Sequence, residues 1–187
     1  NNVLAVEVHN FSAASSDLSS RPFLLAGIDN PAQNYSPTPV WFQPPATLVS
    51  NLPLMWIHTN GQSIVDDPRI TCDMDLIDNG PGNMNCLLDA PNAYQGKITI
   101  EVRGSTSQSF PKVPYGFSTV DATGNDLDVS LLGYPEEHDW ILLNPYNDKT
   151  FMRDVLIYDI ARSLNWYASR TRFIELVIDN DYKGIYV

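Results

Sequence analysis

Apolar and polar residues alternate in several short segments of this chain, a pattern typical of strands with one buried face. In residues 97–102, Ile98, Ile100 and Val102 alternate with polar side chains. Residues 52–59 are almost continuously apolar, which is typical of a central strand. These patterns predict strands at residues 52–59, 71–77, 97–102, 115–120, 139–143, 171–178 and 183–187.

One segment has helical periodicity instead. Apolar residues recur at every fourth position from Met152 to Leu164, and Asp148 stands where a helix N-cap is expected. The pattern predicts a helix at residues 150–164. One helix among many strands indicates the α+β class, with a mainly antiparallel sheet and one main helix.

Residues 1–45 are interpreted as a piece separate from the main domain at residues 46–187. Residues 4–8 alternate as a strand, and the proline-rich residues 29–45 are expected to be a linker. The segment NVLAVEVHNFSAASSDL resembles the last strands of β-sandwich modules appended to secreted bacterial proteins. One alternative is a module that binds glycans, with Trp41 and Phe42 either stacking on sugar or packing within the linker.

Between the strands at 97–102 and 115–120 lies a polar turn that offers candidate anion ligands. Arg103, Gly104, Ser105, Thr106 and Ser107 supply a guanidinium, a glycine and three hydroxyls, and Lys112 is expected on the second strand. The alternative is a surface hairpin whose hydroxyls bond to their own backbone.

The net charge of the chain limits the classes of molecule that it is expected to bind. The net charge of −11 at pH 7 disfavours nucleic acid and anionic membrane surfaces, because both would be repelled. A local basic pocket for one small anion is still compatible with it. The chain has no apolar stretch of roughly 20 residues, the length that crosses a bilayer.

Candidate metal and disulfide chemistry is sparse. Asp73, Asp75 and Asp78 could suggest calcium, but Asp73 and Asp75 stand at alternate positions of one strand, which indicates a solvated strand face rather than a calcium loop, so no metal site is predicted. The sequence leaves open whether Cys72 and Cys86 form a disulfide or stay as thiols. His138 is expected to be a turn residue.

Four motifs in order resemble the CotH family, named for a bacterial spore-coat protein. They are LPLMWIHTNGQSIVDDPRI, GKITIEVRGSTSQSFPKVPYGF, LLGYPEEHDWILLNPYNDKTFMRDVLIYDIARSL and YASRTRFIELVIDNDYKGIYV. The resemblance spans about residues 50–187 and implies the small lobe of an atypical protein-kinase-like fold.

The resemblance also implies an activity. Members phosphorylate serines of secreted or surface proteins with ATP and a divalent metal, Mg²⁺ or Mn²⁺. It implies that Arg103, Gly104, Ser105 and Ser107 face the nucleotide phosphates and that Lys112 engages them. The helix at 150–164 would order this lysine, with Asp159 as its nearest ion-pair candidate. An extracellular or cell-surface location in a bacterium and a secreted or surface acceptor protein are expected.

The sequence departs from the family pattern at two places. Val113 and Gly116 stand where the family usually has basic residues. The family's metal-binding and catalytic aspartates belong to a large lobe beyond Val187, so this chain contains no predicted catalytic residue and is expected to be inactive alone. The alternative is a non-catalytic surface-binding or adhesion module that keeps the fold.

Overall fold

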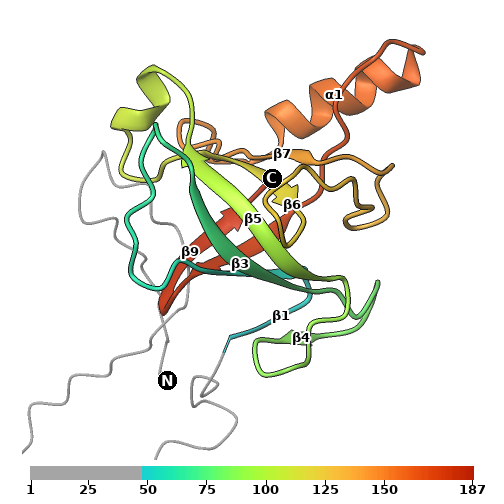
Figure 1. Ribbon diagram of the computed structural model, residues 1–187. Helices are drawn as coiled ribbons and strands as arrows, with labels where there is room; N and C mark the ends of the chain where they lie inside the picture. The colour runs from blue at the N-terminus through green and yellow to red at the C-terminus, as the bar shows by residue number, and fades with distance from the viewer. Residues whose placement is uncertain (1–47) are drawn as a thin grey trace, which may run out of the picture. The chain divides into compact units, whose positions relative to one another are not determined.

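The structure is a computed structural model that describes residues 48–187. The predictions for residues 1–45 lie outside this part of the chain. In order, the elements are β1 (Val49–Ser50), β2 (Leu54–His58), β3 (Ile70–Ile77), β4 (Asn85–Cys86), β5 (Tyr94–Val102), the 3₁₀ turn η2 (Thr106–Ser109), β6 (Tyr115–Val120), β7 (Asp139–Leu142), α1 (Arg153–Ser163), β8 (Ile174–Ile178) and β9 (Asp181–Tyr186) (Figure 1).

The main sheet has seven strands in the order β7-β6-β5-β3-β2-β8-β9. β2 and β8 pair in parallel, and the other neighbours are antiparallel. This confirms the predicted α+β class and the mainly antiparallel sheet. The parallel pair was not predicted, because β8 reaches β2 only after the excursion through α1. β1 and β4 form a separate two-stranded sheet.

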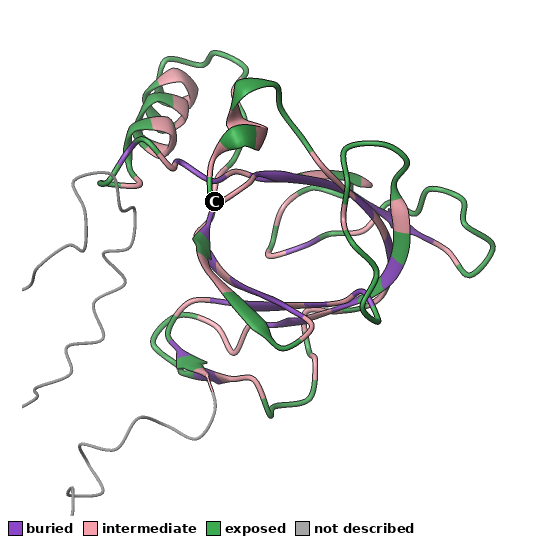
Figure 2. Cartoon of the chain, turned by 90° about the vertical axis from the view of Figure 1, so that its left-hand side faces the viewer, coloured by how far each residue is buried: buried purple, intermediate pink, exposed green. Residues whose placement is uncertain are grey.

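Alternation decides which face of each strand is buried. Ile98 and Ile100 of β5 and Met74 of β3 are completely buried, while the polar residues between them face outward. The continuously apolar β2 lies between β3 and β8, as its pattern predicted. Figure 2 shows the strands curling around this common core.

The two edges of the curled sheet meet. Leu143, directly after β7, and Val187, directly after β9, donate N–H groups to each other's carbonyl oxygens at 2.7 and 3.0 Å. The hydroxyl of Tyr186 adds a hydrogen bond of 2.9 Å to the carbonyl of Val113. Joining the edge strands in this way satisfies backbone groups that an open edge would expose.

Three aspartates on and after β3 each contact a different basic side chain. Asp73 pairs with Lys97 at 3.2 Å, Asp75 with His58 at 3.0 Å, and Asp78 with Arg172 at 2.8 Å. Their carboxylates therefore serve separate surface contacts, as the interpretation of a solvated strand face predicted.

The cysteines are separate thiols in this structure. Cys72 lies in the core on β3, and Cys86 is partly exposed on β4. Burial raises the pKa of the Cys72 thiol to about 12, so it is protonated at neutral pH. Of the two alternatives that the sequence left open, the structure shows thiols rather than a disulfide.

Asn60 and Gly61 form a turn directly after β2. Both residues have positive φ, 56° and 79°, and Gln62 N–H donates to the carbonyl of Thr59 at 3.2 Å. β3 then begins only at Ile70, so the connection from β2 is a long loop.

The helix is shorter than the pattern predicted. Phe151 has a φ of 58°, in the left-handed region, which prevents the helix from starting at residue 150. α1 begins at Arg153, and Met152 rather than Asp148 occupies the N-cap position. Asp148 still serves the helix start, because its carboxylate accepts the N–H of Arg153 at 2.9 Å.

The apolar stripe of α1 does not face the core, contrary to the usual meaning of such a stripe. No residue of α1 is buried, and Leu156 and Ile160 are 54% and 44% exposed. In the part of the chain that is described, no helix is long and apolar enough to cross a membrane.

Candidate functional site

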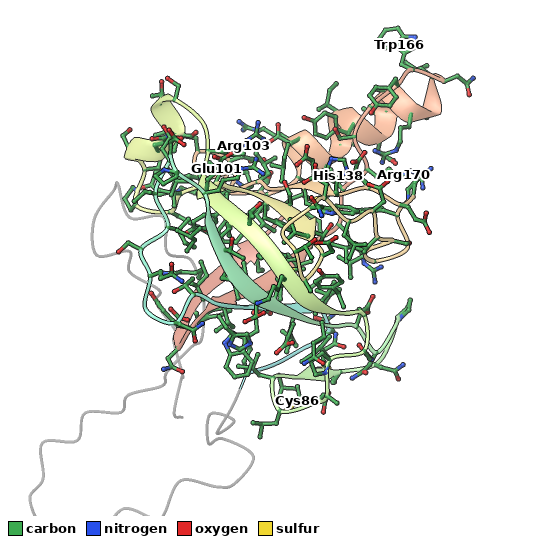
Figure 3. The ribbon with its side chains drawn as sticks, in the orientation of Figure 1. Cys86, Glu101, Arg103, His138, Trp166 and Arg170 are labelled. Carbon is green, nitrogen blue, oxygen red and sulfur yellow. The ribbon has the colours of Figure 1, made fainter. Side chains whose placement is uncertain are left out.

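A cleft of about 680 Å³ lies between the β6–β7 end of the sheet and the segment that follows α1. Its walls combine Arg103 at the end of β5, residues 131–143, Tyr158 and Arg162 of α1, and residues 166–172. This volume lies in the range of small-molecule sites. Arg103, Trp166 and Arg170 are labelled in Figure 3, near α1.

Arginines gather at this cleft, although the chain as a whole is strongly acidic. Arg103, Arg162, Arg170 and Arg172 all line it. Arg172 is held by Asp78 and by the carbonyl of Leu132 at 2.9 Å. Within residues 48–187, the guanidinium groups of Arg103 and Arg170 have no such partner, which leaves them to bind an anion.

One wall of the cleft is a column of stacked aromatic rings. Tyr134 stacks on Trp140 at 6.0 Å between ring centroids, and Phe117 stacks on the same ring at 6.5 Å. Burial raises the pKa of Tyr134 even though Arg172 and its neighbours lower it. The ring stack resembles platforms that hold flat ligands.

The same column carries two orphaned polar atoms. In the described part of the chain, the Tyr134 hydroxyl and the Trp140 indole Nε1–H are buried without a hydrogen-bond partner. Buried donors are normally paired, so these two point to a ligand with acceptor atoms. Sequence reasoning missed this wall. Its signal was the pair of aromatics at 134 and 140 beside the arginines of SRTR at 169–172.

The predicted phosphate turn is only partly brought to the cleft. Among its residues Arg103 lines the cavity, and Gly104 and Ser105 lie on the adjoining exposed turn. Gly104 has a φ of 101°, and a Cβ there would lie 2.0 Å from Ser107 Oγ, so the turn requires glycine. The side chain of Gln108 donates to the Gly104 carbonyl at 2.7 Å.

The expected position of Lys112 is wrong. Lys112 lies in the loop before β6, not on the strand, because Pro111 and Pro114 flank it. Its Nζ donates to the carbonyl of Ile185 at 2.6 Å and lies 4.5 Å from the ring centroid of Tyr186. The amine is therefore drawn to β9 and is not among the residues that line the cleft.

The expected ion pair between Asp159 and Lys112 is also absent from the described contacts. Asp159 pairs with Arg162 at 3.1 Å, three residues along the same helix. This local pair forms because residues at i and i+3 lie on one helix face. The structure thus places Asp159 on α1 as predicted but gives it a different partner.

An acidic cluster surrounds His138, which the sequence predicted only as a turn residue. Its Nδ1 lies 2.6 Å from Asp128 and 3.5 Å from Glu137, and its Nε2 lies 3.7 Å from Asp126 and 3.8 Å from Asp139. The hydrogen bond to Asp128 raises the pKa of His138, and the charges of Asp126 and Asp139 add to the effect. Asp128, Glu137 and His138 offer metal-type ligand atoms within 4.8 Å of one another. The contacts among the described residues of this cluster are hydrogen bonds and ion pairs within the protein, and they give no sign of a bound ion.

A comparison with protein families shows which family the C-terminal part of the chain is similar to. Residues 100–187 match the family described as CotH kinase protein. This confirms the predicted CotH resemblance over the segment that contains Arg103, Lys112 and α1. The match starts at Ile100, so β2 and β3 lie outside it. A kinase family implies ATP and a divalent metal in general terms. No curated protein matches the chain.

Proposed function

We propose that this chain is the N-terminal portion of a CotH-like protein kinase that binds ATP in the arginine-lined cleft. The observation that carries the proposal is the convergence of two uncommitted arginines and two orphaned donors on one cavity. Arg103 and Arg170 would bind phosphate oxygens. The stack of Tyr134 and Trp140 would hold the base, with their buried donors bonded to its acceptor atoms.

Three carboxylates, those of Glu136, Glu137 and Asp139, line the cleft. Asp139 and Glu137 already accept hydrogen bonds from the Ser118 hydroxyl and the His138 N–H, so we expect the metal ligands in the large lobe that the family resemblance implies. When bound, the metal–ATP complex supplies the transferable phosphoryl group and neutralises charge on it. The proposed acceptor is a serine of a secreted or surface protein, at an extracellular or cell-surface location in a bacterium.

The proposal is tested first by nucleotide binding. The 187-residue chain is titrated with a fluorescent ATP analogue in the presence of Mg²⁺ or Mn²⁺, and saturable binding is expected. Arg103→Ala should weaken binding by roughly 10- to 100-fold, because a charge-assisted hydrogen bond to phosphate is lost. The matched control is Arg153→Ala, which removes the same charge from a side chain that is 79% exposed and lies outside the cleft.

Equal binding by both variants, or no binding by the wild-type chain, would refute the nucleotide site. The transfer step is measured separately as phosphate incorporation into a serine-containing protein. We expect it only when the chain is supplied with the large lobe that the family resemblance implies.

A second candidate is a non-catalytic surface-binding or adhesion module, and the contact of Lys112 with β9 favours it. The glycine at position 116 also favours the non-catalytic alternative. A Cβ there would lie 3.6 Å from the Cδ of Arg103, so the basic residue usual in the family would stand beside this arginine. With glycine at this position, the cleft carries one positive charge less than the family pattern would give it. A folded chain that fails to bind any nucleotide would favour this second candidate.

A further inference from the structure

The sequence contains two Asn-Gly pairs, Asn60-Gly61 and Asn79-Gly80. An asparagine followed by glycine is prone to deamidation, because glycine has no side chain to shield its backbone nitrogen from the asparagine side chain. The two pairs are chemically alike along the chain. A difference in their reactivity in the folded protein therefore has to come from the structure around them.

The side chain of Asn79 is held by three hydrogen bonds. Its Nδ2 donates to the carbonyl of Met84 at 3.0 Å and to the carboxylate of Asp89 at 3.1 Å. Its Oδ1 accepts the side-chain amide of Asn92 at 2.8 Å. The Asn79 amide can turn toward the nitrogen of Gly80 only after these bonds break, so the native loop protects it.

The side chain of Asn60 is not held in this way. Asn60 is exposed in the turn after β2, and within residues 48–187 only its backbone N–H is hydrogen-bonded, to the Asp179 carboxylate at 3.2 Å. A Cβ built on Gly61 would have no atom within 4 Å, so the space beside this glycine is open. The Asn60 amide can therefore rotate toward the Gly61 nitrogen without losing a hydrogen bond, and water reaches both groups.

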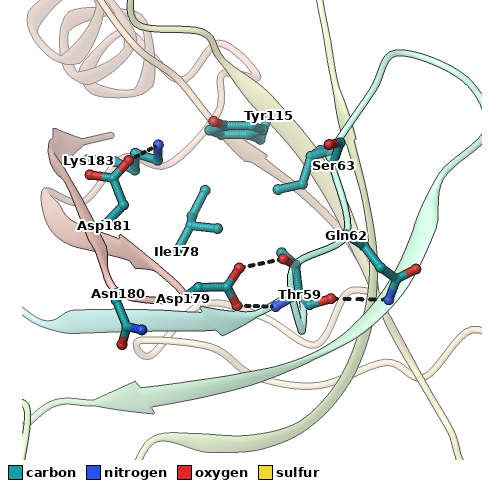
Figure 4. Close-up of a pocket in the computed structure, with 10 residues that line it drawn as sticks. Thr59, Gln62, Ser63, Tyr115, Ile178, Asp179, Asn180, Asp181 and Lys183 are labelled. Atoms are coloured by element: carbon teal, nitrogen blue, oxygen red, sulfur yellow. Dashed lines mark hydrogen bonds and ion pairs between the residues drawn. The ribbon is translucent and has the colours of Figure 1, made fainter.

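A negative charge already lies beside this turn. The Asp179 carboxylate accepts the N–H of Thr59 at 2.8 Å and the hydroxyl of Thr59 at 2.6 Å, which ties the β8–β9 turn to the end of β2 (Figure 4). These contacts, led by the Thr59 hydroxyl, lower the pKa of Asp179, so it is ionised at neutral pH. A second carboxylate formed at position 60 would be repelled by it.

We propose that Asn60 is a site of spontaneous deamidation in the folded protein, while Asn79 is protected. The backbone nitrogen of Gly61 loses its proton to water and attacks Cγ of Asn60. The Cγ–Nδ2 bond breaks, ammonia leaves and a cyclic succinimide remains. Water then opens the ring at either carbonyl and gives aspartate or isoaspartate at position 60. Water thus replaces ammonia, with no oxidant or reductant.

Either product changes the contact with Asp179. Both carry a new negative charge, and isoaspartate also lengthens the main chain between residues 60 and 61 by one methylene group. The repulsion and the longer main chain both weaken the hydrogen bonds that join the end of β2 to the β8–β9 turn. Deamidation at Asn60 is therefore a slow, one-way change that loosens this end of the sheet.

The test measures both asparagines in one sample. The 187-residue chain is incubated at neutral to mildly alkaline pH, and timed samples are digested and analysed by mass spectrometry, with isoaspartate detected by enzymatic methylation. In the folded chain Asn60 should convert at least about 10-fold faster than Asn79, because only the Asn79 loop must open first. In denaturing urea the two rates should agree within about 2-fold, since the hydrogen bonds of Asn79 are then lost.

Two variants test the cause of the protection. Asn92→Ala removes the donor to Asn79 Oδ1 and should speed conversion at Asn79 while leaving Asn60 unchanged. The matched control Asn125→Ala removes an exposed asparagine from another turn and should change neither rate.

Asn60→Asp places the product charge directly and should lower the melting temperature relative to Asn60→Gln. The proposal is overturned if Asn79 converts as fast as Asn60 in the folded chain, or if neither converts when the urea-denatured chain does. Arg103→Ala should leave both rates unchanged, so the result does not depend on the proposed nucleotide site.

Discussion

In β5 the side chains of Ile98 and Ile100 are completely buried, whereas in α1 those of Leu156 and Ile160 are about half exposed. Both segments carry a regular apolar pattern in the sequence. A strand in the middle of a sheet has neighbours on both sides and a curled sheet behind it, so its apolar face is covered as soon as the sheet forms. A helix stripe is buried only if another surface meets it. Periodicity therefore predicts the type of element for both β5 and α1, but it predicts burial correctly only for β5.

The largest expected effect is in the sheet. Ile98→Ala should lower the free energy of unfolding by about 2–5 kcal/mol, because it leaves a cavity in a closely packed core. Urea denaturation followed by tryptophan fluorescence measures the change. A loss below about 1 kcal/mol would mean that β5 is not the core strand that its burial indicates.

An intermediate effect is expected where the chain enters α1. Asp148→Asn should reduce helix content in far-UV circular dichroism, because the charged acceptor for the Arg153 N–H is lost. The pKa of Asp148 is lowered, first by this backbone hydrogen bond and then by the Thr150 hydroxyl. A lowered carboxyl pKa stabilises the fold above the unfolded-state pKa, and the effect disappears as pH falls through the folded-state pKa.

The stability difference between wild type and Asp148→Asn should therefore be present at pH 6 and should shrink below about pH 4. Thermal melts across this range provide the measurement. A difference that does not change with pH would show that the charge of Asp148 plays no part.

The smallest effect is expected on the exposed face of α1. Leu156→Gln should change the free energy of unfolding by less than about 0.5 kcal/mol, since the side chain is 54% exposed and leaves no cavity. The same urea titration as for Ile98→Ala gives a direct comparison. A loss of several kcal/mol would show that the stripe of α1 is covered in solution, and would remove the contrast with β5.

The residues of the arginine-lined cleft differ in how far sequence reasoning reached them. Arg103 was predicted from the polar turn and lies in the cleft. Tyr134 and Trp140 were not predicted as cleft residues, because their stacking depends on how residues 131–143 fold against β6. In the same way the two Asn-Gly pairs are alike in the sequence, and only the structure shows that the asparagine side chain of one pair is held by hydrogen bonds.

The amino-acid sequence by itself determined the local elements, among them the strands β3, β5, β6, β8 and β9, because alternation acts over a few neighbouring positions. It also carried the family resemblance that the match over residues 100–187 confirmed. Only the tertiary structure decided that the sheet edges meet at Leu143 and Val187, that Lys112 turns to β9 and that α1 leaves its stripe exposed. Each of these depends on contacts between segments far apart in the chain, whose partners local periodicity does not specify.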